Sequence, residues 1–204
     1  MTDYRFLVET YASERLKTLN VWSMFQDDDL DVRPHPGLGH DRTAHEHMVH
    51  QSLSEDKWFR GMFGIDVGVP PLPASETRLA FIERYAEVSG QRLALLQEQD
   101  QAWWEQEVAF FDTAHSRAWI MVRRIAHTAH HRGEQTTLLR LLGRAVYSVY
   151  GPAVDTGGLP ANNAVTINAY PDVASLLDGE AHGGRKAALP GPGEKPSTER
   201  PDRP

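Results

Sequence analysis

The stretch of residues 125–143, IAHTAHHRGEQTTLLRLLG, reads as a helix but contains residues that are poor helix formers. Histidine and glycine both favour a helix less than Ala, Leu or Glu do. Three histidines and a mid-helix glycine therefore need a reason other than helix formation. The helix is predicted to begin at Thr113 or Ala114 and to end at Leu142, with Gly143 as its C-cap. It would be about 45 Å long.

Three further segments have helical periodicity. Residues 3–25 place apolar side chains near one face. Thr43 opens a second helix, because Thr43 and Glu46 have the spacing of a capping box, and Ser75 is the predicted N-cap of a third helix. Residues 103–112 break the period and are expected to form a short extended or irregular crossover. Four helices of similar length predict an all-α fold, a four-helix bundle with a long crossover between helices.

The character of the chain changes after the last helix. Residues 1–143 are assigned to the bundle, and residues 144–182 to an irregular extension that packs on the bundle or on a partner subunit. Within this extension we predict one strand at 164–169 and one short helix at 172–177. Residues 183–204 are rich in proline, glycine and charge, and are predicted to be a disordered tail.

The composition narrows the possible functions. The 204 residues include no cysteine, which excludes disulfides, cysteine-ligated zinc, iron–sulfur clusters and a thiol nucleophile of the chain itself. A net charge of −7 disfavours nucleic acid as a partner, because such binding needs a basic face. With no apolar run near the roughly 18 residues of a membrane span and no visible signal peptide, we expect a soluble cytoplasmic protein without a membrane partner.

The histidines of the quoted stretch have the spacing of metal ligands. His127 and His131 are four residues apart, so both rings project from one face of a helix and can reach one ion. His130 is rotated away and is expected to face outward. A metal site needs at least one more ligand from elsewhere in the fold.

A second histidine cluster lies at the start of the second helix, at His45, His47 and His50. It is not the HExxH motif of zinc proteases, since Val49 occupies the position of the second histidine. His45 and His47 follow closely after Thr43 and are expected to be solvated, with His47 as the runner-up ligand.

Two motifs together carry a resemblance to a known family. Residues 127–143 resemble the last helix of the DinB/YfiT-like family, with His-x-x-x-His, then Arg-Gly, then Leu-Leu-Arg-x-x-Gly. His50, Glu55 and Trp58 match that family's pattern of a histidine, an acidic residue and a tryptophan on the second helix. The resemblance covers the architecture of roughly residues 1–143 and departs at Glu134, where a glutamine is usual.

The resemblance implies a ligand set and an assembly. In similar proteins one histidine of the second helix and the His-x-x-x-His pair of the last helix bind a divalent metal ion. The corresponding residues here are His50, His127 and His131. A homodimer is also expected from the resemblance.

Four other residues near the predicted site have alternative roles. Glu55 either orients a ligating imidazole or is a solvated helix residue. Arg132 either binds an anionic substrate or forms a salt bridge. Glu55 and Glu134 are also possible catalytic bases. Gly133 is expected to allow the close approach of another helix or of a second subunit.

Three imidazoles leave coordination positions open, which is the layout of a catalytic site. Imidazole suits zinc, nickel or iron alike, so the sequence does not identify the ion. Several proteins similar to the family transfer or isomerise with bacillithiol, mycothiol or glutathione. Our leading prediction is therefore metal-dependent transfer of a low-molecular-weight thiol to an electrophilic small molecule. The alternatives are hydrolysis by a metal-bound hydroxide and a noncatalytic metal-binding protein of the stress response.

Overall fold

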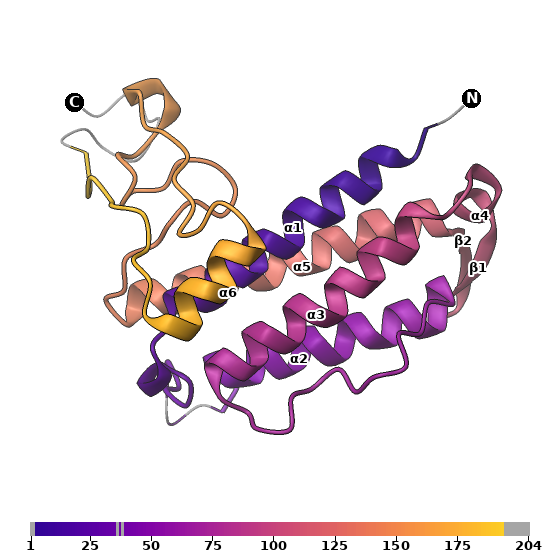
Figure 1. Ribbon diagram of the computed structural model, residues 1–204, viewed down its shortest axis with the longest axis horizontal. Coiled ribbons are helices and arrows are strands. Elements are labelled where there is room, and N and C mark those ends of the chain that lie inside the picture. The colour runs from indigo at the N-terminus through magenta and orange to yellow at the C-terminus, as the bar shows by residue number, and fades with distance from the viewer. Residues whose placement is uncertain (1–2, 36, 38, 194–204) are drawn as a thin grey trace.

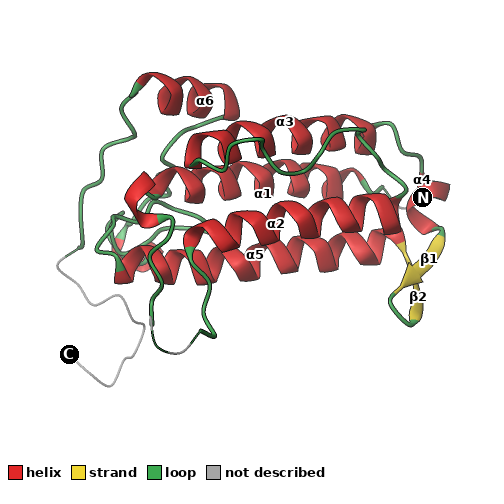
Figure 2. Cartoon of the chain, turned by 90° about the horizontal axis from the view of Figure 1, so that it is seen from below, coloured by secondary structure: helices red, strands yellow, loops and turns green. Residues whose placement is uncertain are grey.

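The computed structural model describes residues 3–35, 37 and 39–193, and four long helices form its body (Figures 1 and 2). They confirm the predicted four-helix bundle. None of the helices in these ranges is long and apolar enough to cross a bilayer. The four helices are α1 (Arg5–Met24), α2 (Ala44–Trp58), α3 (Arg78–Gln97) and α5 (Arg117–Leu141).

The chain crosses the bundle diagonally between α1 and α2. Helix α1 packs against α3 and α5, and α2 packs against the same two helices, so α1 and α2 occupy opposite corners. The crossover includes a 3₁₀ helix, η1 (Asp27–Asp29), which meets the other helices at one end of the bundle. Asp27 pairs with Arg78 at the start of α3, and Asp29 pairs with Arg144 just after α5. Figure 1 shows that α2 and α3 both start at this end of the bundle and run in the same direction.

The predicted caps of α2 and α5 are present. Thr43 accepts a hydrogen bond from the backbone N–H of Glu46, whose side chain accepts one from the backbone of Thr43 in return. Helix α2 continues into a π-helical turn, η2 (Phe59–Phe63), and Gly64 ends it in the left-handed conformation. Gly143 follows α5 with the same backbone conformation, at a φ of 69°.

Two predicted helix starts were wrong. Helix α3 begins after Thr77 and not after Ser75, because the Thr77 side chain accepts the hydrogen bond from Ala80. Helix α5 begins after Ser116, at Arg117, three or four residues later than predicted, because the preceding residues form a β-hairpin. Its strands are β1 (Glu107–Phe110) and β2 (Thr113–Ser116), which pair in antiparallel register at the end of the bundle (Figure 2).

The expected crossover before the hairpin is partly helical. A short helix, α4 (Gln101–Glu105), starts at Asp100, whose carboxylate accepts from the N–H of Trp103. This end of the bundle is closed by aromatic contacts, since the rings of Tyr4 and Trp104 stack at 6.0 Å.

The extension after α5 packs on the bundle through α6 (Val173–His182), which contacts α1 and α3. The helix is longer than predicted, because Gly183 and not residue 177 ends it. The predicted strand at 164–169 is not present. The backbone N–H of Ile167 donates to the Ser148 hydroxyl and its carbonyl accepts from the Ser148 N–H, but these two bonds do not form a β-ladder. A 3₁₀ helix, η3 (Pro160–Asn162), precedes it. The division into three segments stays a prediction, and residues 194–204 of the expected tail lie outside the described residues.

The core consists of two apolar clusters with a polar layer between them. One cluster surrounds Trp22 at the η1 end, and the other surrounds Phe59 at the hairpin end. Tyr85 of the first cluster and Tyr11 of the second both donate hydrogen bonds to Glu55. The polar layer at mid-bundle is the setting of the site described next. The apolar face predicted for the first helix is buried throughout, at Leu7, Tyr11, Leu19 and Trp22.

Candidate metal centre

The structure brings the three predicted ligands together. His50 comes from α2, and His127 and His131 come from successive turns of α5, which packs against α2. The Nε2 atom of His131 lies 3.0 Å from Nε2 of His50 and 3.2 Å from Nε2 of His127. Their potential ligand atoms all fall within 4.8 Å of one another, a spacing at which three imidazoles can share one ion. We call these three residues the histidine triad.

The triad is held in the neutral form that metal binding requires. Burial lowers the pKa of His50 to about 4, and the neighbouring Arg42 charge adds to the effect. Burial, with Arg124 next, lowers the pKa of His127 to about 3. The pKa of His131 is also below its usual value, mainly through burial. At neutral pH the three rings therefore carry lone pairs and no charge, and no proton must leave before an ion binds.

Glu134 orients the central ring of the triad. Its Oε2 lies 2.6 Å from Nδ1 of His131. Burial raises the pKa of this carboxyl, but the hydrogen bond from the His131 ring outweighs burial and holds the pKa below its usual value. An ionised carboxylate only accepts, so Nδ1 carries the proton and the lone pair of Nε2 points toward the other two rings. The three-residue spacing between His131 and Glu134 was the available sequence signal.

Glu55 neither orients a ligating imidazole nor lies in solvent, which were the two structural alternatives predicted for it. It is 0% exposed, and its oxygens accept from the hydroxyls of Tyr11 at 2.7 Å and Tyr85 at 2.9 Å. Arg92 and Arg124 lie 3.5 and 3.3 Å from the same carboxylate. Burial raises its pKa, but the two guanidinium groups and the tyrosine hydrogen bonds more than reverse this. Glu55 is thus an ionised, fully partnered carboxylate inside the bundle, neither solvated nor bonded to an imidazole.

Arg124 connects the triad to the group formed by Glu55, Tyr11, Tyr85, Arg92 and Arg124, which we call the Glu55 cluster. The guanidinium of Arg124 hydrogen-bonds to Ser54 at 3.0 Å, and its Nη1 lies 3.4 Å from Nδ1 of His127. The contact places a fixed positive charge beside the triad, which is one cause of the low pKa of His127.

Neither Arg132 nor Gly133 has the functional role that was considered for it near the triad. Arg132 is buried and pairs with Glu14 of α1, with Thr18 at 3.4 Å, so the geometry favours the salt-bridge alternative over substrate binding. Gly133 is exposed, and a Cβ built there would meet nothing within 4 Å. The expected close approach of another helix is therefore wrong within the described part of the chain, because this face of α5 has no neighbour. Approach by a second subunit stays untested.

Of the other histidines of α2, His47 is buried and not solvated, and it agrees with its place as runner-up ligand, because its ligand atom and those of His131 and Glu134 lie within 4.8 Å of one another. His47 is 4% exposed, because its position on α2 turns it toward α5, where its ring centre lies 5.9 Å from that of His131. Its Nδ1 has no hydrogen-bond partner and lies 3.9 Å from Glu134. His45 is only half-buried and pairs with Glu76 of the α2–α3 linker. His130 is exposed, as predicted.

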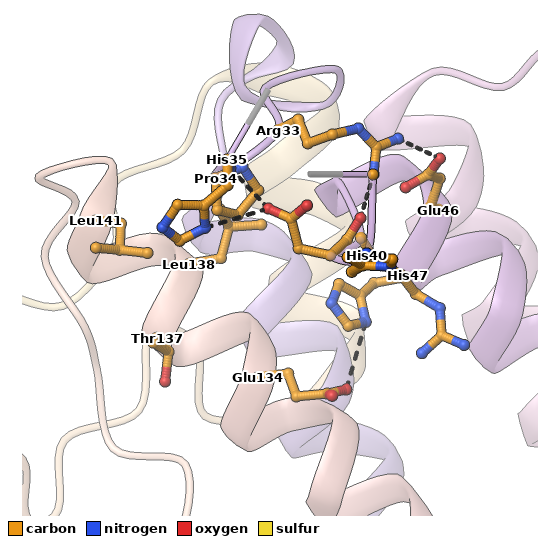
Figure 3. Close-up of a pocket in the computed structure, with 13 residues that line it drawn as sticks. Arg33, Pro34, His35, His40, Glu46, His47, Glu134, Thr137, Leu138 and Leu141 are labelled. Atoms are coloured by element: carbon orange, nitrogen blue, oxygen red, sulfur yellow. Dashed lines mark hydrogen bonds and ion pairs between the residues drawn. The ribbon is translucent and has the colours of Figure 1, made fainter. Parts of the chain in front are cut away.

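A polar cavity of about 890 Å³ adjoins the triad on the side of His47 and Glu134 (Figure 3). In Figure 3 the side chains of these two residues face each other at one edge of the cavity. The loop before α2 supplies the opposite wall, where Arg33 pairs with Glu46 at 2.6 Å. His35 and His40 of this loop line the cavity as well.

Comparisons with known proteins identify the family and support the fold. The sequence model of the DinB family matches residues 1–158. The chain belongs to the DinB family. A search of curated proteins gave no match.

Solved structures support the fold of this DinB protein. A DinB-like protein from Bacillus cereus ATCC 10987 superposes with a TM-score of 0.61 at 21% identity, over 71% of this chain and 95% of that one. YfiT from Bacillus subtilis superposes with a TM-score of 0.55 at 15% identity, over 71% of this chain and 91% of its own. YfiT is described as a probable metal-dependent hydrolase with an unusual four-helix bundle topology. At these identities the likeness establishes the bundle and not the reaction.

Proposed function

We propose that this DinB protein is an enzyme that holds one divalent ion with His50, His127 and His131. The observation that carries the proposal is the convergence of three neutral Nε2 atoms, with Nε2 spacings of 3.0 and 3.2 Å. Zinc, nickel and iron all suit such a donor set. Three protein ligands leave at least one coordination position for a reactant.

We further propose that the reaction is transfer of a low-molecular-weight thiol to an electrophilic small molecule. A divalent ion supplies the means of keeping a thiol deprotonated at neutral pH. The thiolate sulfur forms a bond to the electrophilic carbon, the leaving group departs with its bonding electrons, and the thiol proton goes to solvent. Since the chain has no cysteine, the sulfur must come from the cosubstrate.

The positions of the two candidate bases support a thiol over water as the nucleophile. Glu55 has both oxygens engaged inside the bundle, and Glu134 is bonded to the Nδ1 side of His131, opposite its Nε2. Neither carboxylate is placed to accept a proton from a molecule at the Nε2 side. A thiol needs such a base less than water does, because its own pKa is already near 8.5.

Hydrolysis is the second candidate, favoured by the description of YfiT as a probable metal-dependent hydrolase. In that case a bound water with its pKa lowered to about 7 would be the nucleophile, as in other tris-histidine sites. We further propose a cytoplasmic location and a homodimer, with a small-molecule substrate in either case and a thiol cosubstrate if the reaction is thiol transfer.

One experiment separates these candidates. Purified protein is assayed for bound metal, for conjugation of monochlorobimane with a panel of thiols, and for ester hydrolysis without thiol. His127→Ala and His131→Ala are expected to lose metal and activity together, whereas the matched control His130→Ala, an exposed residue of the same helix, keeps both. Unchanged metal content in both triad variants would refute the site. Ester turnover without thiol would favour hydrolysis, and bound metal without either activity would favour a noncatalytic protein.

A further inference from the structure

A second cavity adjoins the triad along the outward face of α2. Its volume is about 570 Å³, within the range of roughly 300–1,000 Å³ that ligand pockets occupy. Residues on successive turns of α2 form one wall, and η2 and the hairpin close one end. We call this cavity the α2 trough; its lining includes Val49, His50, Leu53, Trp58, Met62 and Phe111.

The α2 trough adjoins the triad at His50. His50 belongs to both, since it lines the trough and places its Nε2 3.0 Å from Nε2 of His131. Trp58 also lines the trough, with its ring centre 5.8 Å from that of His127. A molecule in the trough therefore lies against one member of the triad, His50, and against Trp58, which contacts a second member, His127.

Phe111 is held over the trough at a cost to the fold. It occupies the first position of the two-residue loop between Phe110 and Thr113, with a φ of 54°. Hairpin loops with positive φ favour glycine or asparagine, because a Cβ clashes with the backbone there. The side chain of Phe111 is nevertheless an aromatic ring, 71% exposed. The ring contacts that of Phe110, with 4.8 Å between their centres, but most of it stays in water, and strain of this kind at an exposed position points to a function.

We propose that the α2 trough binds the apolar body of the electrophilic substrate and presents its reactive carbon to the triad. Leu53, 45% exposed, and Phe111 supply apolar contact area that the free protein leaves in water. The inference rests on the proposed function, because it assigns the substrate of that reaction to an apolar, ring-sized class. A concave site that shares a wall with the triad fits a small molecule better than the flat face of a second subunit.

The test measures binding and stability independently of turnover. Bimane without its chlorine is an unreactive probe, titrated by fluorescence into metal-loaded protein. Leu53→Glu and Phe111→Gly are each expected to weaken its binding about tenfold, through loss of apolar contact. Val122→Glu and Phe6→Ala are matched controls, since both alter exposed apolar residues outside the trough. They are expected to bind the probe as the wild type does.

The melting temperature shows whether Phe111 serves binding or the fold. Phe111→Gly relieves the backbone strain, so its Tm is expected to stay level or rise by about 2–4 °C while probe binding falls. A Tm lower than that of Phe6→Ala would make Phe111 structural and overturn the inference. No saturable binding by the wild type, or unchanged binding in both trough variants, would also overturn it. Dissociation of a dimer by Leu53→Glu alone, seen by gel filtration, would assign the trough to a subunit interface instead.

Failure of the proposed function would give a different experimental result from failure of this inference. In that case metal or turnover is missing in the wild type, although the probe still binds and the trough variants still weaken it.

Discussion

The Glu55 cluster and the histidine triad lie side by side between α2 and α5, yet their polar atoms are in opposite situations. The Glu55 carboxylate is enclosed and contacts two tyrosine hydroxyls and two guanidinium groups. In the triad, His50 and His127 are half-buried and His131 is buried. The neighbour of each Nε2 atom is the Nε2 atom of another imidazole. A carboxylate whose oxygens are both satisfied inside the protein stabilises the fold, whereas imidazoles with spare lone pairs can bind an ion. The following predictions test that contrast.

The largest expected effect is on stability, from Glu55→Ala. Removing this carboxylate leaves Arg124 buried without its counter-charge, and it leaves Arg92 with Asp56, 2.8 Å away, as its acidic partner. Loss of one partner of a buried ion pair costs about 3–5 kcal/mol, and urea unfolding followed by circular dichroism measures it. A cost below about 1 kcal/mol would show that the cluster does not stabilise the fold.

Next in size is the effect of Glu134 on metal affinity. Glu134→Ala removes the acceptor of the His131 Nδ1 proton, and loss of such a partner weakens metal binding about 10–100-fold. Glu134→Gln is the matched control, because an amide oxygen can accept the same hydrogen bond. Calorimetric titration with zinc should rank the affinities as wild type, then Gln, then Ala. Equal affinities for Ala and wild type would contradict the orienting role.

The third prediction concerns pH in metal-stripped protein. The unfolded chain protonates its histidines near pH 6.5, whereas the folded state holds His50 and His127 neutral down to pKa values of about 4 and 3. Proton uptake thus favours the unfolded chain, so the free energy of unfolding should fall as the pH drops from 6.5 toward 4. Urea midpoints at pH 7 and 5.5 measure the fall, and His127→Gln should lessen it. The same pH dependence in both proteins would show that the triad is not the cause.

The smallest effect is expected at Gly133. A methyl group there would meet no atom, so Gly133→Ala should stabilise α5 by about 1 kcal/mol or less through helix propensity. Thermal unfolding measures this, and gel filtration shows whether the added methyl disturbs a dimer. Destabilisation together with dissociation would place a second subunit against this face.

Much of the bundle could be predicted because its signals are local. The capping box at Thr43, the C-cap at Gly143 and the four-residue spacing of His127 and His131 each act within one or two turns. The third ligand, His50, came from a family resemblance, since helical spacing within α2 does not say what faces α2.

What could not be predicted depends on contacts between helices. His47 precedes His50 by three residues and shares its face, but only the packing of α2 on α5 buries it. Glu55 is ionised in the interior because its partners converge from other helices, so no local pattern marks it. The late start of α5 has a similar origin, because pairing across the hairpin takes residues that would otherwise have extended the helix.

The partners of Glu55 come from every long helix of the bundle: Tyr11 from α1, Tyr85 and Arg92 from α3, and Arg124 from α5. One carboxylate on α2 therefore fixes the longitudinal position of all four helices. Sliding any of them by one turn, about 5.4 Å, would bury an unpaired charge or hydroxyl. His50 lies five residues from Glu55, and His127 three from Arg124. The same alignment that locks the bundle thus sets the spacing of imidazoles from two different helices, although Glu55 touches neither.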